Sequence, residues 1–478
     1  MITGRICLGD GYWNQNKSQN KRGRIIVDDM KTAILLAELI AEQSGTAYFV
    51  GGFVRDKIMK HENKDIDIEV HGISSDVLED ILDRIGKRME IGESFGIYGI
   101  KGCGLDIALP RKERPCGKGH RDFDIDVDPF IGTEKAALRR DFTINALMEN
   151  ILTGEITDHF GGVSDISNKI IRHVSDKTFP EDPLRVLRAA QFAARFEFDI
   201  ADETLSLCRD IDLSTLSKER IEGELVKALL KAEKPSLFFE SLRKMNQLDA
   251  WFPEVKMLIG VPQNSKYHME GDVWNHTMMV LDEAAKYRDR STYPYGFMMT
   301  ALVHDFGKAI CTEKKNGVYH AYEHETKGLP IVREFLHRIT NEKKLMHYVL
   351  NMTKLHMKPN VLANAKASVK STNKMFDSSV SPIDLIYIAQ ADDNGRKTLV
   401  QGESTESFLL ERLEIYNKTI EKPYVTGRDL IDAGLIPNEN FKEILSYAHK
   451  LRLADVDKES ALKQTISYAA KLNKLSIK

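Results

Sequence analysis

Three acidic residues alternate with apolar ones in ENKDIDIEV, residues 62–70. Asp65, Asp67 and Glu69 occupy every second position, so a β-strand would place all three on one face. Like charges on one strand face repel each other. The first two acids would lie about 6–7 Å apart along the strand, which suits Mg²⁺ with substrate phosphates. A solvated face of an edge strand is the alternative.

A glycine pair precedes this strand in YFVGGFVRD, residues 48–56. Gly51 and Gly52 would let backbone amides approach a ligand closely, and a helix that begins there directs its N-terminus at an anion. The guanidinium of Arg55 suits phosphate oxygens. An ordinary turn is the alternative for the glycine pair.

Two arginines and an aspartate lie together in LRRDFTINALMEN, residues 138–150. Arg139 and Arg140 can clamp a triphosphate, while Asp141 or Asn145 can reach a ribose or a base. Asp141 is alternatively the N-cap of an apolar helical stretch. Both roles are compatible.

The next helix is expected in PEDPLRVLRAAQFAARF, residues 180–196. Pro183 suits the first helical position, which makes Asp182 a candidate N-cap. Arg185 and Arg188 follow in steps of three on the same face. An aspartate and an arginine on one rigid face offer an acceptor and donors to a nucleobase edge. A cap with a solvated ion pair is the alternative.

Histidines and aspartates form a second constellation, His276, His304, Asp305 and Asp392. Imidazole and carboxylate groups together suit a divalent or transition metal. A single histidine is more often an ordinary core or surface residue. An adjacent His-Asp pair inside an apolar helix is costly to bury without partners, so we expect a metal site.

Composition describes an ordinary soluble chain of two to four domains, with 478 residues, 42% hydrophobic and 29% charged. The net charge of −3 shows that the protein is not basic overall, so any nucleic-acid contact requires a local basic surface. The five cysteines form no C-x-x-C pair, so we expect free thiols in a reducing cytoplasm and no cysteine zinc site. Neither a signal peptide nor a transmembrane helix is expected.

Hydrophobic patterns predict an α+β head followed by a mostly helical body. Residues 30–165 mix strands and helices, and helical patterns dominate after about residue 166.

Together, the motifs over residues 45–200 resemble the class II tRNA nucleotidyltransferases of the polymerase β superfamily, which comprise CCA-adding enzymes and bacterial poly(A) polymerases. The motifs are Gly-Gly-x-x-Arg-Asp, Asp-x-Asp, Arg-Arg-Asp-(x)₃-Asn-Ala-Leu and Glu-Asp-x-x-Arg, in that order. DHFGGVSDISNKIIRHV, residues 158–174, is similar to the family's connecting segment.

The resemblance implies a mixed-sheet nucleotidyltransferase head and all-α regions behind it. The expected parts are a polar extension (1–28), the head (29–165), a helical neck for base recognition and RNA binding (166–265), an HD phosphohydrolase domain (266–400) and a helical C-terminal region that contacts the tRNA body (401–478).

The resemblance also implies a role for each motif residue. Asp65 and Asp67 are the catalytic carboxylates and hold two Mg²⁺ ions. The nucleotide-binding set is Gly51, Gly52, Arg55, Asp56, Arg139, Arg140, Asp141, Asn145, Glu181, Asp182, Arg185 and Arg188, in which Glu181, Asp182 and Arg185 match the family's amino-acid template. Asp106 is a candidate third carboxylate. RKERPCGKGHRD, residues 111–122, resembles the mobile loop near the active site.

The histidine constellation resembles an HD phosphohydrolase domain, because Gly307 and Lys308 complete an HDxGK pattern. His324 and His356 fall where binuclear members carry extra ligands, in looser surroundings. Relatives of this arrangement have phosphatase or 2′,3′-cyclic phosphodiesterase activity, and we expect an active site with a divalent metal. Residues 424–445 resemble the C-terminal part of such enzymes, with Lys442 near the tRNA body.

The expected function is addition or repair of the 3′-terminal CCA of tRNA from CTP and ATP, without a nucleic-acid template. The alternatives are an A-adding enzyme or poly(A) polymerase, and a phosphohydrolase whose head only binds RNA or nucleotide. The expected partners are tRNA, CTP and ATP, with no membrane. Sequence patterns leave the HD substrate, its metal and the oligomeric state open.

Overall fold

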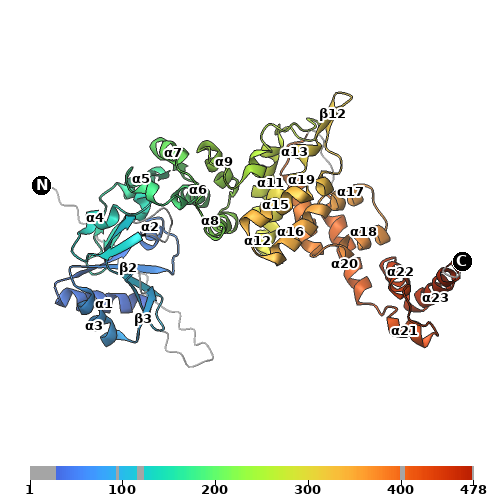
Figure 1. The fold of residues 1–478 in the computed structure, drawn as a ribbon, viewed down its shortest axis with the longest axis horizontal. Coiled ribbons are helices and arrows are strands. Elements are labelled where there is room, and N and C mark those ends of the chain that lie inside the picture. The colour runs from blue at the N-terminus through green and yellow to red at the C-terminus, as the bar shows by residue number, and fades with distance from the viewer. Residues whose placement is uncertain (1–27, 93–95, 116–122, 399–403, 476–478) are drawn as a thin grey trace. The chain divides into compact units, whose positions relative to one another are not determined.

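The computed structural model describes residues 28–92, 96–115, 123–398 and 404–475 (Figure 1). The chain divides into two compact units: the first comprises Met1–Arg114, Asp124–Ala137 and Leu147–His159, and the second comprises the rest. The finer domain boundaries expected from the sequence stay predictions. The N-terminal extension up to residue 27 and the centre of the 111–122 loop lie outside the described residues.

A seven-stranded mixed sheet organises the first unit, in the order β3-β4-β5-β2-β1-β8-β9. Its strands are β1 (Thr46–Val50), β2 (Ile66–His71), β3 (Arg88–Gly92), β4 (Ile97–Ile100), β5 (Leu105–Ala108), β8 (Met148–Asn150) and β9 (Ile156–Thr157). β2 pairs in parallel with β5 and antiparallel with β1, which confirms the mixed sheet of the predicted head. β6 (Arg111–Pro115) and β7 (Phe123–Val127) form a separate pair.

Helices pack on this sheet through apolar faces. They are α1 (Asp29–Glu42), α2 (Gly52–Ile58), α3 (Ser75–Ile85) and α4 (Thr133–Ala137). Leu36 and Ile40 of α1 are fully buried, and α1 contacts both β1 and α3. The Asp28 side chain accepts the backbone N–H of Lys31 and caps the helix, which confirms the helical periodicity seen in the sequence.

The acidic strand differs from the expected pattern at two positions, because Asp65 lies just before β2 and Glu69 is buried. Glu69 is only 2% exposed, and its Oε1 lies 3.0 Å from Nε2 of His71. This carboxylate is therefore buried against a partner two residues away on the same side of the strand. Asp65 and Asp67 keep some solvent exposure. The three acids therefore do not form the row of equally exposed negative charges that their alternation in the sequence suggests.

The second unit is mainly helical, with short strands. Its first part holds η1 (Thr143–Asn145), α5 (Gly162–Asn168), β10 (Ile170–Ile171), η2 (Phe179–Glu181), α6 (Leu184–Phe196), β11 (Asp199–Ile200), α7 (Asp202–Arg209), α8 (Lys218–Lys231), α9 (Ser236–Lys244) and α10 (Pro253–Lys256). Its middle part holds α11 (Val273–Ala285), η3 (Arg288–Arg290), α12 (Pro294–Val303), α13 (Lys308–Cys311), β12 (Glu313–Lys315), β13 (Val318–His320), α14 (His324–Lys327), α15 (Leu329–Ile339), α16 (Lys343–Leu355), α17 (Lys358–Asn364), α18 (Val369–Asp377) and α19 (Pro382–Asn394). Its last part holds α20 (Glu406–Glu421), α21 (Gly427–Asp432), α22 (Phe441–Leu453) and α23 (Lys458–Leu475).

Two local predictions in this unit need correction. No α-helix follows Asp141, because the chain makes the short 3₁₀ turn η1 and then enters strand β8. The helical capping role of Asp141 was therefore wrong. Helix α6 begins at Leu184 with Pro183 at its N-cap, one residue later than expected, and Oδ1 of Asp182 still accepts the N–H of Leu184 at 3.1 Å.

Helices α11 and α19 cross with their backbones in close contact. A methyl group on Gly395, which directly follows α19, would lie 2.6 Å from Cα of Val280 in α11. Only a residue without Cβ permits this approach. The separation of the two helices is therefore set by backbone contact.

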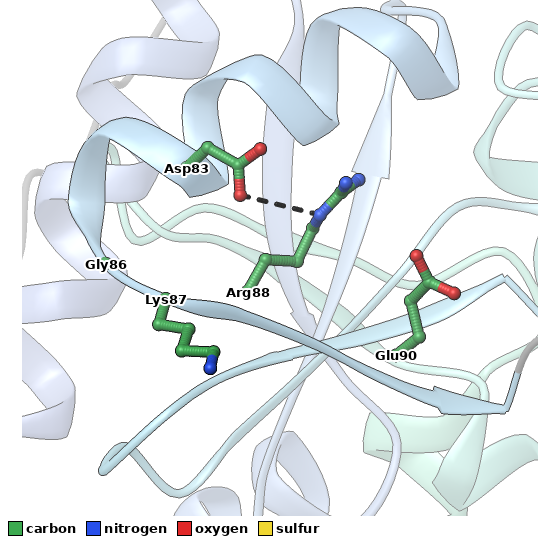
Figure 2. Close-up of a pocket in the computed structure, with 5 residues that line it drawn as sticks. All are labelled: Asp83, Gly86, Lys87, Arg88 and Glu90. Atoms are coloured by element: carbon green, nitrogen blue, oxygen red, sulfur yellow. Dashed lines mark ion pairs between the residues drawn. The ribbon is translucent and has the colours of Figure 1, made fainter.

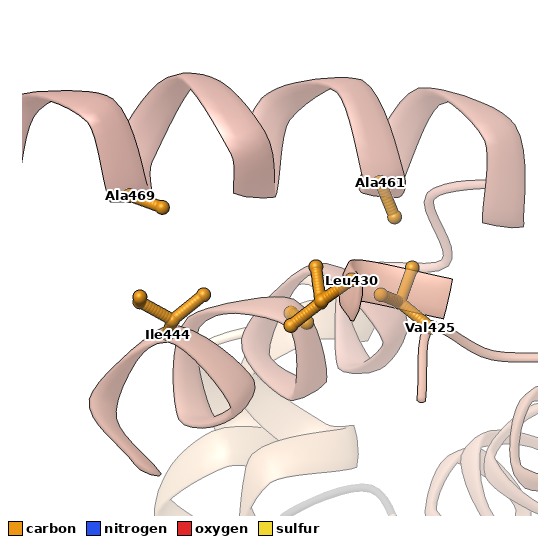
Figure 3. Packing of buried hydrophobic residues seen from close by; sticks show 6 residues of the cluster. Val425, Leu430, Ile444, Ala461 and Ala469 are labelled. Carbon is orange, nitrogen blue, oxygen red and sulfur yellow. The ribbon is translucent and has the colours of Figure 1, made fainter. Parts of the chain in front are cut away.

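The C-terminal helices have a small core of their own (Figure 3). Val425, Leu430, Ile444 and Ala461 are buried there between α21, α22 and α23. Thr426 and Asp429 form a capping box at the start of α21. The predicted helical C-terminal segment is confirmed.

A surface pocket lies where α3 leads into β3 (Figure 2). Its lining mixes charges, and Nε of Arg88 lies 3.5 Å from Oδ1 of Asp83. Arg88 also contacts Glu79, so this cation is already compensated by carboxylates. Across the described parts of the chain, no helix has the length and apolar character needed to cross a membrane.

Gly395→Ala should destabilise the protein, because the new methyl group forces α11 and α19 apart. We expect a loss of about 1–3 kcal/mol, seen as a lower urea midpoint in circular dichroism. Gly223→Ala in α8 is the matched control, since a methyl group there meets no described atom within 4 Å; we expect a gain of about 0.5–1 kcal/mol. An unchanged midpoint for Gly395→Ala would contradict the close-packing argument.

Candidate functional site

Two candidate carboxylates lie on the neighbouring parallel strands β2 and β5, and Asp65 directly precedes β2. Asp67 of β2 stands in register with Asp106 of β5, so their Cα atoms are about 4.8 Å apart. Asp106 and Asp65 are exposed and Asp67 is half-buried. The sheet thus presents three carboxylates to ligands, although among the described residues they do not converge into a metal-binding group of three.

The glycine motif leads into a buried ion pair. Gly51 is the N-cap of α2, and Gly52 is its first residue. Arg55 is 4% exposed and its Nε donates to Oδ1 of Asp56 at 2.7 Å. Asn63 donates to the other oxygen of Asp56 at 2.8 Å. These contacts hold the start of α2 next to the loop that leads into the acidic strand.

Asp141 is the centre of a hydrogen-bonded group in the second unit. Its Oδ2 accepts from Nε of Arg188, and its Oδ1 accepts from Nδ2 of Asn145, at 2.6 and 3.0 Å. Burial opposes ionisation of this carboxylate, but the charge and hydrogen bond of Arg188, the hydrogen bond of Asn145 and the charge of Arg185 together hold the pKa of Asp141 below its ordinary value. Asp141 therefore orients Arg188 and Asn145.

The predicted base-recognition residues are fixed by backbone and side-chain contacts. The Arg185 guanidinium donates to the carbonyl oxygens of Thr178 and Arg139 at 2.6 and 2.7 Å. Glu181 ends the 3₁₀ turn η2 and is exposed, while Arg140 is half-buried.

Arg220 of α8 was missed by the sequence analysis. Its Nη2 donates to both carboxylate oxygens of Asp182, at 3.0 and 2.8 Å. The sequence separation of 38 residues hides this pair from local pattern reasoning.

The second constellation gathers six side chains from five segments. His276 lies in α11, His304 and Asp305 follow α12, His324 begins α14, His356 follows α16, and Asp392 lies in α19. Ligand atoms of His276, His304 and Asp392 lie within 4.8 Å of one another, as do those of Asp305, His324 and His356. The structure therefore brings His324 and His356 together with the predicted HD residues. The His-Asp pair itself lies at the end of α12 and not inside it.

Three of the four histidines have their ring orientation fixed by the backbone. Nδ1 of His304, His324 and His356 lies 2.7–2.8 Å from the carbonyl oxygen three residues earlier. A carbonyl can only accept, so Nδ1 carries a hydrogen, and in the neutral ring Nε2 then keeps its lone pair.

In the neutral rings, these Nε2 lone pairs face other hydrogen-bond acceptors. Nε2 of His324 lies 3.3 Å from Nε2 of His356 and 3.1 Å from Oδ1 of Asp305. Nε2 of His276 lies 3.4 Å from Oδ2 of the same aspartate and 3.1 Å from Oδ1 of Asp392. Such buried acceptors repel each other unless a cation lies among them, so these residues fit the binding of a divalent metal.

Hydrogen-bond accounting supports this fit. Within the described residues, both ring nitrogens of His276, Nε2 of His304 and both oxygens of Asp305 are buried without a hydrogen-bond partner of good geometry. Burial lowers the pKa of His356 to about 3, so this imidazole is neutral and able to bind a metal at ordinary pH.

Close packing and one lysine complete the site. Nζ of Lys308 lies 2.6 Å from Oδ2 of Asp305 and donates to Oε1 of Gln263 at 2.9 Å. A methyl group on Gly307 would lie 2.1 Å from the carbonyl oxygen of His324. Glycine at this position therefore allows α14 to bring His324 up to Asp305.

Known proteins match the chain in sequence and fold. Residues 47–172 match the family described as the poly A polymerase head domain. A Multifunctional CCA protein of Shewanella frigidimarina is 39% identical over 337 residues, 69% of this chain and 78% of that protein. Its counterpart from Actinobacillus pleuropneumoniae is 34% identical over 360 residues, 73% and 85% of the two chains. The Thermotoga maritima CCA-adding enzyme complexed with tRNA shares the fold at 20% identity, with a TM-score of 0.63 and coverage of 93% and 97%.

Arg188→Met should leave the Asp141 carboxylate buried without its cation. We expect a loss of about 2–3 kcal/mol at pH 7, measured by urea unfolding, and a smaller loss in the double variant Asp141→Asn/Arg188→Met. In the wild type, the lowered pKa of Asp141 gives stability that is lost as pH falls through that pKa.

In Arg188→Met, less positive charge opposes the effect of burial, so the pKa of Asp141 rises and protonation recovers part of the lost stability. The difference between wild type and variant should therefore shrink between pH 7 and pH 4. A difference that stays constant over this range would show that the pair does not govern the ionisation of Asp141.

Proposed function

The chain belongs to the family of multifunctional CCA proteins, the class II CCA-adding enzymes, and on this premise we propose that it builds or repairs the 3′-terminal CCA of tRNA. CTP and ATP are the substrates, pyrophosphate is released, and no nucleic-acid template is used. The observation that carries this function is the 34–39% identity to multifunctional CCA proteins over about two thirds of this chain or more. The match to the head-domain family supports the same reaction.

We propose that the carboxylates at the start of β2 form the catalytic centre. Asp65 and Asp67 would hold Mg²⁺, with Asp106 as a third carboxylate. The metal, when bound, supplies Lewis acidity that activates the tRNA 3′-hydroxyl and stabilises the departing pyrophosphate. Glu69 is not a ligand in this proposal, because it is buried against His71.

Base selection is proposed for the face of α6 and the residues before it. Asp182 is held by Arg220, and Arg185 by two carbonyl oxygens, so an acceptor and a guanidinium have fixed positions before a nucleotide arrives. Fixed groups lose little conformational freedom on binding and discriminate by hydrogen-bond geometry. Arg139, Arg140 and Asn145 are proposed to bind the triphosphate and ribose, together with Gly51, Gly52, Arg55 and Asp56.

A poly(A) polymerase or A-adding enzyme remains the competing function, because its head carries the same motifs. A protein whose head only binds RNA is less well supported, since pure binding does not require paired carboxylates on neighbouring strands. Labelled CTP separates these functions directly, because a strictly A-adding enzyme has no use for it.

A second activity, metal-dependent phosphoester hydrolysis, is proposed for the HD residues. The specific observation is that buried lone pairs of His324, His356 and Asp305 face one another within 3.1–3.9 Å. A divalent metal held there supplies the Lewis acidity that activates water against a phosphoester. His276, His304 and Asp392 would hold a second ion on the other oxygen of Asp305.

The proposed partners are tRNA, CTP and ATP, and the proposed location is the cytoplasm. Among the described residues Cys103, Cys208 and Cys311 carry free thiols, as a reducing compartment requires. Lys442 at the exposed start of α22 is proposed to approach the tRNA body.

The CCA assay uses tRNAs that end before CCA, at C and at CC, each with labelled CTP or ATP separately. We expect CTP to be incorporated into the two shorter tRNAs and ATP into the tRNA that ends in CC. Adenylation of the CC-ending tRNA alone would establish an A-adding enzyme instead.

Asp65→Ala and Asp67→Ala should abolish nucleotide addition, by at least about 1,000-fold in rate. Glu69→Gln is the matched control on the same strand and should only weaken the reaction. Equal loss from all three would show that the division between Glu69 and its neighbours is wrong.

Asp305→Ala should remove phosphoesterase activity towards 2′,3′-cyclic nucleotides while nucleotide addition continues. The aspartate faces both groups of histidines, so its loss should also remove tight binding of divalent metal. Hydrolysis that survives in Asp305→Ala, or in chelator-treated wild type, would contradict the proposed metal centre.

A further inference from the structure

His276 differs from the other histidines of the metal centre in how its ring is held. His304, His324 and His356 lie at helix ends, where Nδ1 reaches the carbonyl oxygen three residues earlier. His276 lies inside α11, where the carbonyl oxygens are occupied by the helix itself. Its Nδ1 therefore needs a side-chain partner.

Glu270 lies where this partner is needed. Its Oε1 is 3.3 Å from Nδ1 of His276 and 2.8 Å from Nδ1 of His268. The Glu270 side chain is 2% exposed, so its charge is not dispersed by solvent.

The other oxygen of Glu270 reaches a second ligand-bearing segment. Oε2 accepts the backbone N–H of Lys397 at 2.9 Å, and the N–H of Met269 donates to the carbonyl of Lys397 at 2.7 Å. Lys397 follows α19, which carries Asp392. One carboxylate thus contacts the histidine of α11 and the chain just beyond the aspartate of α19.

We infer that Glu270 is the positioning residue of the metal group formed by His276, His304 and Asp392. Its Oε1 is the carboxylate oxygen that faces Nδ1 of His276, at 3.3 Å, although the two atoms make no hydrogen bond of good geometry here. Acceptance of the Nδ1 proton by Glu270 directs the Nε2 lone pair at the metal and raises its basicity. Glu270 also holds the end of α19 so that Asp392 faces the same point. This inference deepens the proposed phosphoesterase site and rests on it.

Glu270 is not itself a ligand in this arrangement. Its Oε1 lies on the Nδ1 side of the His276 ring, whereas Asp305 and Asp392 lie on the Nε2 side. The imidazole ring therefore separates Glu270 from the metal position. A carboxylate behind a histidine in this way supports the ligand without binding the ion.

The test measures metal binding by the full-length protein. Metal-free wild type and Glu270→Gln are titrated with Co²⁺ by calorimetry, and the visible absorption of bound Co²⁺ reports its coordination. We expect Glu270→Gln to bind the same number of ions, with the affinity for one of them reduced about 10–100-fold. The absorption bands of that ion should shift, because the His276 ring is no longer fixed.

Glu283→Gln is the matched control. Glu283 also lies on α11, but it pairs with Lys286 at 2.6 Å, away from the metal ligands. Its substitution should leave affinity and absorption unchanged, and circular dichroism should show equal helicity in all three proteins.

Three results would overturn a part of this account. Unchanged affinity and absorption in Glu270→Gln would refute the positioning role while the metal centre stands. Loss of one bound ion at saturating Co²⁺ would identify Glu270 as a metal ligand and would refute the inference that it only positions His276. Failure of wild type itself to bind Co²⁺ would refute the proposed phosphoesterase centre instead.

Discussion

The carboxylate of Asp305 imposes the strongest electrostatic constraint in the helical unit. It is 1% exposed, and the Nε2 atoms of four histidines lie within 3.9 Å of its two oxygens. The helices that supply these groups are separated by long stretches of sequence, so the site forms only when the segment from α11 to α19 is folded. Lys308 contributes one compensating charge, which is too little for so many acceptors in a low-dielectric interior.

In the sheet-containing unit and at α6, several acids have partners within the chain. Glu69 lies against His71, Asp56 against Arg55, and Asp141 against Arg188. Asp65 and Asp67 keep the solvent contact that a metal ion with its phosphates needs, and Asp106 stands beside them in register.

Much of both sites could be predicted because their chemistry lies in local motifs. The alternation of Asp65, Asp67 and Glu69 predicted the strand, and the HD pair predicted the place where the buried histidines and aspartates gather. Local patterns failed where a distant partner decides the outcome. Arg220 contacts Asp182 across 38 residues, and nothing near either residue signals the pair.

Glu270 shows that sequence patterns can also fail for residues that lie close together in the chain. Glu270 lies close to His276 in the sequence, but the residues around it, 268–272, predict only a break between helices. The role of Glu270 depends on which nitrogen of His276 faces the other ligands and on where Lys397 lies. Both are set by tertiary structure. The turn after Asp141 is similar: its apolar residues have helical character, but strand pairing of β8 with β1 overrides that local preference.

The close crossing of α11 and α19 has a consequence for how this centre tolerates sequence change. Because Gly395 meets the backbone of Val280 directly, the spacing of the two ligand helices there does not depend on the size of interlocking side chains. Apolar residues elsewhere in this core are then free to drift among similar volumes over evolutionary time. Retention of this one glycine would then maintain the distance between His276 and Asp392, without a coordinated set of packing residues.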